Sequence, residues 1–141
     1  MTYRAPRYLY LDVETTGLDP EKDRILELAY ALDDGPVTSS WFPVTTAQLA
    51  EADPHALTLN RITERGFRPS DAGRTAEDRW RFALDMTVLW DLRDVTLVGA
   101  NPSFDAAFLR RWTTRPPWRH RLLDVEVYAM PYLGLQEPLR L

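Results

Sequence analysis

Short apolar runs separated by polar turns make up the first part of the chain. Tyr8 to Val13 is a nearly continuous apolar run, which is the pattern of a strand covered on both faces. Arg24 to Leu32 and Ser39 to Val44 are further strand candidates, and the turn-rich segment Asp33 to Pro36 separates them. These three runs predict an antiparallel meander.

A helical pattern begins at Thr75. Thr75 and Asp78 form a capping box, and apolar side chains recur at helical spacing from Trp80 as far as Leu92. Thr96 to Ala100 then has the pattern of another buried strand. The chain therefore changes from consecutive strands to an alternation of helix and strand.

The second half of that alternation begins with a helix start signal. Asn101 and Pro102 suit the N-cap and first position of a helix that extends through about Trp112. A last short strand is expected around Leu123. Strands first, and then strand and helix in alternation, predict an α/β fold with a mixed sheet flanked by helices.

The composition indicates a single domain over residues 1–141. The 141 residues are 45% hydrophobic, which is enough for one buried core but too little for two domains of ordinary size. The sequence contains no Cys, which excludes disulfides and thiolate metal sites and favours a reducing cytoplasm. No apolar run approaches the roughly 20 residues of a membrane span. We therefore expect a soluble cytoplasmic protein with no membrane partner.

Two carboxylates end the first predicted strand. Asp12 and Glu14 lie two residues apart, so their side chains project to the same side of a strand. Carboxylates so close repel each other unless a cation bridges them. An all-oxygen ligand set favours Mg²⁺ or Mn²⁺ over Zn²⁺. Taken alone, the pair has a second explanation, in which Glu14 and Thr15 simply begin a polar turn.

A third carboxylate lies in the first turn of the helix that follows Thr96 to Ala100. Asp105 comes shortly after an apolar strand, near the strand ends where open α/β sheets build their sites. The alternative is structural, because the helix dipole stabilises an acidic residue in a first turn without any function.

Together the two segments resemble a known family. "DVETTGLDPEKDRILELA" from Asp12 and "LVGANPSFDAAFLRRW" from Leu97 are similar to the first two motifs of the DEDD 3′–5′ exonuclease superfamily. The closest resemblance is to DEDDh, DnaQ-like members such as epsilon-type proofreading subunits and ribonuclease T. It extends to about Tyr132, since "HRLLDVEVYA" is similar to the strand and helix start that follow the second motif.

The resemblance implies an RNase H-like fold, with three antiparallel strands followed by two parallel ones, and a two-metal hydrolysis of phosphodiester bonds. The two Mg²⁺ or Mn²⁺ ions of such sites lie about 3.5 to 4 Å apart. On this template the catalytic and metal-binding residues are Asp12, Glu14 and Asp105. The substrate-binding residues would be Thr15, Thr16, Leu18, Asn101 and Phe104. Leu18 would pack against terminal bases, unless it is an ordinary core leucine, and Glu27 is interpreted as structural.

Two motif segments depart from the family pattern. The family's second motif has His-Asn before Phe-Asp, whereas this chain has Ala100-Asn101 and inserts Pro102-Ser103. An "IHGIT"-like segment is replaced by Leu57 to Thr63, in which Asn60 and Arg61 either take over a contact to the 3′ nucleotide or do nothing. We expect altered substrate contacts rather than an altered fold.

The third family motif, which supplies a His and a fourth metal-binding Asp from a C-terminal helix, is absent. His120 and Asp124 have a similar spacing, but Asp124 already matches the strand-ending Asp after the second motif. We therefore expect a C-terminally incomplete domain that lacks its last helices. The chain is a truncated product, the ordered part of a longer one, or a divergent form that obtains its last ligand from a partner.

Two functions remain open at this point. The first is a 3′–5′ exonuclease acting on single-stranded DNA or RNA, and the second is an inert nucleic-acid-binding or polymerase-associated module of the same fold. A polymerase or a second copy of the chain is a candidate partner. The net charge of −4 does not favour binding of polyanions by the whole surface, but the basic segment Arg110 to Arg121 suits a nucleic-acid backbone. A solvated helix end explains the same segment.

Overall fold

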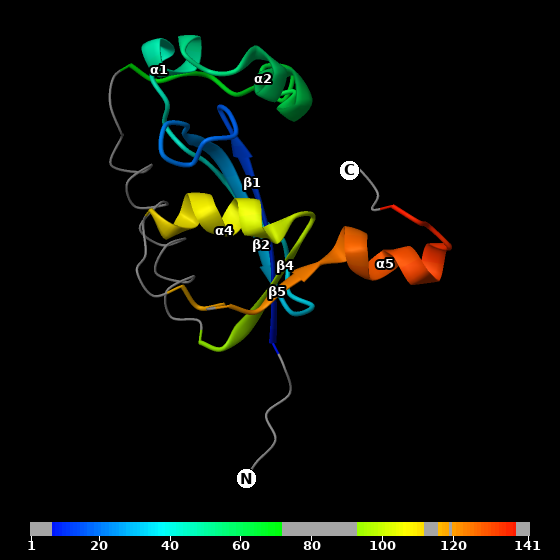
Figure 1. Cartoon of the computed structure of the whole chain (residues 1–141). Coiled ribbons are helices and arrows are strands. Elements are labelled where there is room, and N and C mark those ends of the chain that lie inside the picture. The colour runs from blue at the N-terminus through cyan, green and yellow to red at the C-terminus, as the bar shows by residue number, and fades with distance from the viewer. Residues whose placement is uncertain (1–6, 72–92, 112–115, 119, 138–141) are drawn as a thin grey trace. The chain divides into compact units, whose positions relative to one another are not determined.

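A computed structural model describes residues 7–71, 93–111, 116–118 and 120–137 (Figure 1). Its strands are β1 (Arg7–Thr15), β2 (Ile25–Leu32), β3 (Thr38–Trp41), β4 (Val95–Gly99) and β5 (Leu122–Asp124). Its helices are α1 (Thr46–Ala50), α2 (Pro54–Asn60), α4 (Pro102–Arg110) and α5 (Val125–Leu133). Each predicted strand is present, and the helix predicted from Thr75 to Leu92 lies outside the described residues. No helix in the described part of the chain is both long and apolar enough to cross a membrane.

The five strands form one mixed sheet in the order β3-β2-β1-β4-β5. β4 runs parallel to β1, with Arg7 opposite Val95 and Tyr10 opposite Val98, and β5 runs parallel to β4. β2 and β3 are neighbours joined by residues 33–37, a connection too short for a parallel crossover. The prediction of a mixed α/β sheet is confirmed.

Strand β1 differs from its prediction in burial. Leu9, Leu11 and Val13 are buried, but Tyr8 is 36% and Tyr10 45% exposed. The expectation of a strand covered on both faces is therefore wrong. A tyrosine can place its ring against the sheet and its hydroxyl in water, so an apolar run that contains tyrosines does not require burial of both faces. The same alternation leaves Asp12 exposed.

The chain divides by its contacts into two compact units. The first consists of Met1–Asp12, Tyr30–Thr38 and Trp90–Leu141, and the second consists of Val13–Ala29 and Ser39–Leu89. Both units contribute to the strands, since β1 passes from one to the other between Asp12 and Val13.

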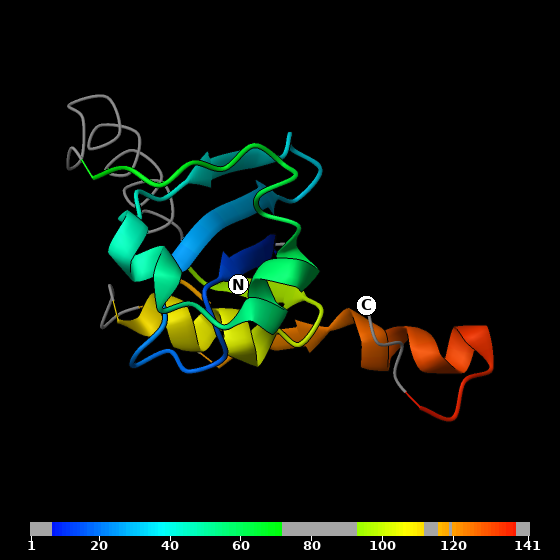
Figure 2. The same ribbon diagram turned by 90° about the horizontal axis from the view of Figure 1, so that it is seen from above.

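In the first unit, α4 packs against β4 and β5 (Figure 2). The helix buries Ala106, Phe108 and Leu109, and Phe108 stacks on Phe104 with ring centroids 5.0 Å apart. Asn101 is its N-cap and Pro102 its first residue, as the sequence predicted. The helix ends at Arg110 instead of near Trp112.

In the second unit, helices α1 and α2 were missed by the sequence analysis. Their residues pack on a small core made of Leu26, Val44, Ile62 and Phe67, with Leu49 and Leu57 against it. Each helix has a start signal in the sequence, a capping box at α1 between Thr45 and Gln48 and a side-chain cap by Asp53 at α2. His55 follows this cap and lies in the first turn of α2.

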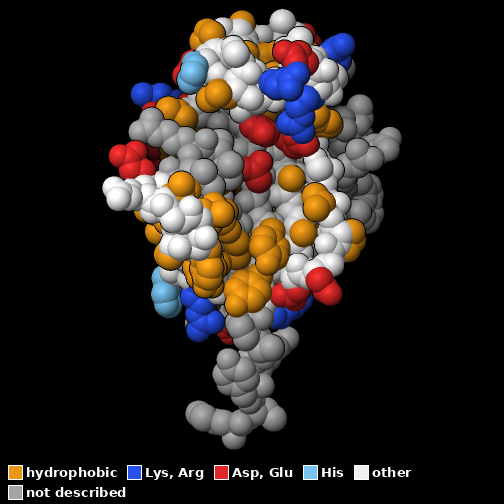
Figure 3. Space-filling model, turned by 90° about the vertical axis from the view of Figure 1, so that its right-hand side faces the viewer, with side chains coloured by type: hydrophobic (Ala, Val, Ile, Leu, Met, Phe, Trp, Pro, Cys, Tyr) orange, Lys and Arg blue, Asp and Glu red, His pale blue; other side chains and the backbone are white. Residues whose placement is uncertain are grey.

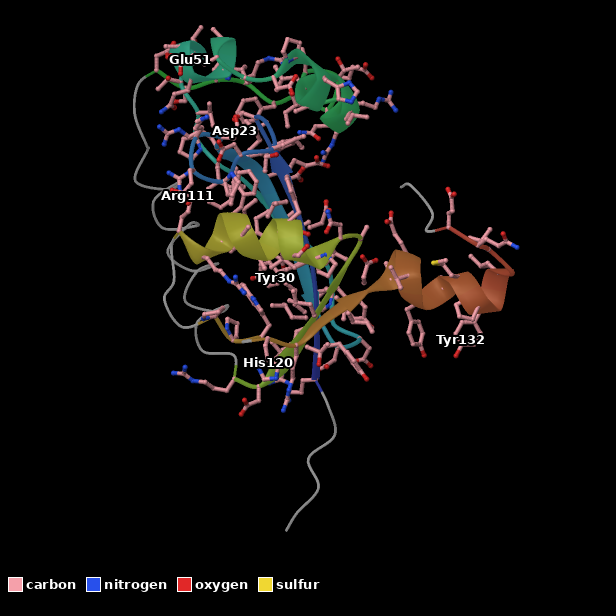
Figure 4. The ribbon with its side chains drawn as sticks, viewed as in Figure 1. Asp23, Tyr30, Glu51, Arg111, His120 and Tyr132 are labelled. Atoms are coloured by element: carbon pink, nitrogen blue, oxygen red, sulfur yellow. The ribbon has the colours of Figure 1, made fainter. Side chains whose placement is uncertain are left out.

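Large apolar side chains are exposed on β1, β5 and α5 of the first unit. They are Tyr8, Tyr10, Leu122, Val127, Tyr128, Tyr132 and Leu133, and Figure 3 shows a face on which hydrophobic side chains gather. Tyr132, labelled in Figure 4, hydrogen-bonds to Tyr128 and raises the pKa of that residue. Among the described residues, α5 has no buried member.

Asp33 joins the end of β2 to the start of β1 and makes stability depend on pH. It accepts a hydrogen bond from the Tyr8 backbone N–H at 2.8 Å and one from Arg7 Nε at 3.2 Å, and these contacts lower the pKa of its carboxyl. A lowered carboxyl pKa stabilises the fold above the unfolded-state pKa, and this stabilisation is lost as pH falls through the folded-state pKa. The contribution is therefore complete at neutral pH.

We predict that Asp33→Asn lowers the free energy of unfolding at pH 7 and leaves it unchanged near pH 2. Asn tolerates the positive φ of 52° at this position, so the substitution removes charge with little backbone strain. Urea unfolding at both pH values measures the difference. An equal loss at the two pH values would show that the effect is not electrostatic.

Candidate active site

Asp105 occupies a fixed place between α4 and the sheet. It lies in the first turn of the helix and is 3% exposed. A Cβ placed on Gly99, the last residue of β4, would lie 3.8 Å from Asp105 Oδ2 and 3.0 Å from the backbone oxygen of Leu11. A side chain at Gly99 would therefore press on the β1 backbone at Leu11, and the Asp105 carboxylate lies within ordinary contact distance of the same position.

Asp12 belongs to the same unit and follows Leu11 directly. Its side chain is exposed to solvent. The parallel pairing of β1 and β4 thus brings the backbone beside Asp12 close to Asp105. The expectation that the strand ends at these carboxylates is wrong, because β1 continues through Asp12 and Glu14 to Thr15, and the grouping of Asp12 with Asp105 in one site stays a prediction.

Glu14 lies in the second unit and has a basic neighbour that the sequence analysis did not identify. Arg65 Nη1 is 3.7 Å from Glu14 Oε1, and Arg65 Nη2 donates to Glu27 Oε2 at 2.5 Å. Glu27 is 6% exposed and also accepts a short hydrogen bond from Ser39 Oγ. The buried Glu27 carboxylate thus holds the Arg65 guanidinium by a direct hydrogen bond, and its interpretation as structural stays a prediction.

The loop between β1 and β2 is held by Asp23, labelled in Figure 4. Asp23 Oδ1 accepts from Thr16 Oγ1 at 3.1 Å, and Asp23 Oδ2 accepts from the Asp19 N–H at 2.9 Å. A Cβ on Gly17 would collide with the Asp23 carboxylate, so this carboxylate fills the space that the glycine leaves. The loop carries Leu18, which is 75% exposed, and the alternative that Leu18 is a core residue is wrong.

Thr15 and Thr16 are buried and use their hydroxyl groups within the protein. Thr15 Oγ1 donates to the Gly17 carbonyl at 2.7 Å, and Thr16 Oγ1 accepts from the Arg24 N–H at 2.9 Å. Asn60 Nδ2 donates to the Thr15 carbonyl at 2.8 Å. Asn60 therefore supports the strand end that carries the candidate site, and a direct contact of either threonine with a sugar stays a prediction.

The remaining candidate residues lie on or near α4. Asn101 is exposed and accepts a hydrogen bond from Ser103 at 2.7 Å, and Phe104 is half-buried against Phe108. Contact of Asn101 and Phe104 with substrate stays a prediction. In the basic segment, Arg110 and Arg111 are exposed.

The C-terminal candidates have structural roles. Asp124 ends β5 and caps α5, accepting from the backbone N–H of Glu126 at 2.9 Å. The rejection of His120 and Asp124 as a substitute third motif agrees with this cap. Trp118 is 1% exposed, so it is a core residue.

The donor chemistry of Asp12, Glu14 and Asp105 suits a hard divalent cation. Three carboxylates offer oxygen ligands of the kind that Mg²⁺ and Mn²⁺ prefer. Over residues 7–71, 93–111, 116–118 and 120–137, however, no group of three His, Cys, Asp or Glu side chains is arranged to hold a metal ion. The residue types therefore fit such a cation, and one of them, Glu14, is paired with an internal cation instead.

Comparison with solved structures identifies the fold. A product-bound exonuclease I aligns with a TM-score of 0.62 and 20% identity over 92% of this chain and 32% of that chain. The metal-free E. coli exonuclease I–ssDNA complex gives 0.62 and 20%, over 91% and 30%. The zinc-bound form of that complex gives 0.63 and 18%, over 94% and 30%. No family model and no curated protein matches the sequence.

The likeness confirms the predicted RNase H-like exonuclease fold. The chain spans about a third of the length of the exonuclease I chains that it matches. At 20% identity the comparison is one of fold, so membership of the DnaQ-like branch stays a prediction.

We predict that Asp23→Ala loosens the loop that carries Leu18. The change removes the acceptors of the Thr16 hydroxyl and the Asp19 N–H, and leaving such groups unpaired costs about 1 to 3 kcal/mol. Hydrogen exchange at the Asp19 amide should accelerate and the free energy of unfolding should fall. Glu21→Ala, at an exposed position of the same loop, is the matched control. Unchanged exchange at Asp19 in Asp23→Ala would contradict the assignment.

Proposed function

We propose that the chain is a metal-dependent exonuclease domain that hydrolyses phosphodiester bonds at the 3′ end of single-stranded DNA or RNA. The observation that carries the proposal is the buried Asp105 carboxylate, which lies beside Gly99 where β4 adjoins Leu11, the residue before Asp12, on a fold shared with exonuclease I. Solved structures of exonuclease I with single-stranded DNA and with oligonucleotides support a nucleic-acid substrate. Their metal-free and zinc-bound forms support a metal requirement.

Asp12, Glu14 and Asp105 are the proposed metal-binding carboxylates. Mg²⁺ or Mn²⁺, when bound, would activate water and neutralise the charge of the phosphate. The chain's own contribution is to keep Asp105 buried in a fixed orientation and to leave Asp12 open to solvent. Leu18, on a loop braced by Asp23, would pack against the terminal base.

A second candidate function is an inert nucleic-acid-binding or polymerase-associated module. It is favoured by one observation, the pairing of Glu14 with Arg65, because a carboxylate balanced by an internal cation does not need a metal ion. Both candidate functions use the same fold to bind nucleic acid, but only the exonuclease hydrolyses it.

We predict that the chain shortens end-labelled single-stranded DNA or RNA stepwise from the 3′ end in Mn²⁺ and that EDTA stops the reaction. Asp12→Asn should lower the rate about 100-fold or more, because charged groups at the reacting centre typically contribute that much. The control is Asp34→Asn, an exposed acidic residue of the same unit, which should retain full activity.

Three outcomes distinguish the candidates. Cleavage that Asp12→Asn abolishes supports the enzyme and its site. Binding of oligonucleotide with no cleavage in Mn²⁺ supports the inert module. Cleavage that Asp12→Asn leaves intact excludes the proposed site.

We predict that Leu18→Ala weakens binding of a single-stranded oligonucleotide about five- to tenfold, which corresponds to part of the burial energy of one leucine side chain. Leu18 is 75% exposed in the free protein, so the thermal midpoint should not change. Leu59→Ala, at a 68% exposed position on α2, is the matched control and should bind like the wild type. Equal affinities of all three proteins, measured by fluorescence anisotropy, would remove Leu18 from the site.

A further inference from the structure

Arg65 lies among acidic and aromatic side chains of the second unit. Its guanidinium donates to Glu27 at 2.5 Å and lies 5.1 Å from the centroid of the Trp41 ring, within the range of a cation–π contact. Trp41 in turn contacts Phe67, with ring centroids 5.4 Å apart and planes inclined by 56°. The Glu14 carboxylate also lies near the guanidinium, at 3.7 Å.

The two carboxylates around Arg65 are not equivalent. The Glu27 side chain is 8% exposed and that of Glu14 is 27% exposed. The contact with Glu27 is a charge-assisted hydrogen bond, whereas 3.7 Å is too long for a hydrogen bond and leaves a looser ion pair. Arg65 is thus bonded to the buried carboxylate and only adjacent to the candidate metal ligand.

This difference affects how easily a cation can bind Glu14. A guanidinium bonded directly to Glu14 would occupy its oxygen atoms and repel a divalent ion. A guanidinium bonded to Glu27, with Trp41 within cation–π distance, still offsets part of the negative charge but lies 3.7 Å from Glu14 Oε1, beyond hydrogen-bond distance.

We propose that Glu27 is a positioning residue that, by binding Arg65, keeps Glu14 available to a divalent metal ion. The inference rests on the proposed function, because it assumes that Glu14 binds metal. Glu27 acts through Arg65 and does not itself touch the ion. Ser39, which donates to the other oxygen of Glu27, fixes the orientation of that carboxylate.

The test is Mn²⁺ binding by isothermal titration calorimetry to the wild-type chain and to Glu27→Gln. The substitution keeps the size of the side chain and one acceptor oxygen but removes the charge, so Arg65 should move its ion pair to Glu14. The dissociation constant for Mn²⁺ should rise about two- to fivefold, the size expected for forming a partly exposed ion pair. Glu64→Gln is the matched control, since Glu64 pairs with Arg61 on the same segment and its variant should bind Mn²⁺ like the wild type.

A double variant separates positioning from a loss of structure. Arg65→Met with Glu27→Gln removes both charges of the Arg65–Glu27 pair, so the buried Glu27 position carries no unpaired charge. This variant should bind Mn²⁺ at least as tightly as the wild type. If the role of Glu27 were merely structural, removing Arg65 as well would not restore Mn²⁺ binding. Urea unfolding in EDTA checks whether Glu27→Gln alone folds. If it does not, the double variant provides the test in its place.

The results that overturn the inference differ from those that overturn the proposed function. Equal Mn²⁺ affinity of wild type and folded Glu27→Gln overturns the positioning role alone, and so does weaker binding by the double variant. A wild-type chain that binds no Mn²⁺ overturns the proposed metal site and the positioning role with it.

Discussion

The parallel pairing of β1 with β4 is the constraint on which the candidate site depends. The register Arg7 opposite Val95 through Tyr10 opposite Val98 brings Leu11 of β1 beside Gly99, where the chain turns into α4. A glycine at this point allows the β1 backbone at Leu11 to approach β4 closely, and Asp105 lies beside the same glycine. A shift of one residue would turn Asp12 toward the opposite face of the sheet. The position of two candidate ligands thus follows from backbone pairing before any side chain chemistry is considered.

Local signals made the junction from β4 to α4 predictable from sequence. An apolar run, Asn101, Pro102 and an acidic first turn lie within a few residues of one another, and these are local signals of a helix start. Asn101 occupies the N-cap position without a side-chain hydrogen bond to the helix. The order of strands and the mixed sheet followed from the same kind of signal. The exposed face of β1 was not predictable in this way, because a tyrosine has an apolar ring and a polar hydroxyl and so fits either environment.

The surroundings of Glu14 were missed for a different reason. Arg65 is far from Glu14 and Glu27 in the sequence, and no spacing rule connects an arginine in a turn with acids on two strands. Its placement comes from the small core of Leu26, Val44, Ile62 and Phe67, which fixes the segment after α2. The carboxylates themselves were recognisable by motif, whereas the cation that balances one of them required the folded chain.

Gly17 and Asp23 are coupled in a way that bears on evolution. The Asp23 carboxylate occupies the volume where any larger residue at position 17 would place its Cβ, and it is held there by Thr16 and Asp19. A relative with alanine at position 17 must therefore move this carboxylate or replace it. Covariation between these two positions is the signature that this loop geometry would leave in a set of diverged sequences.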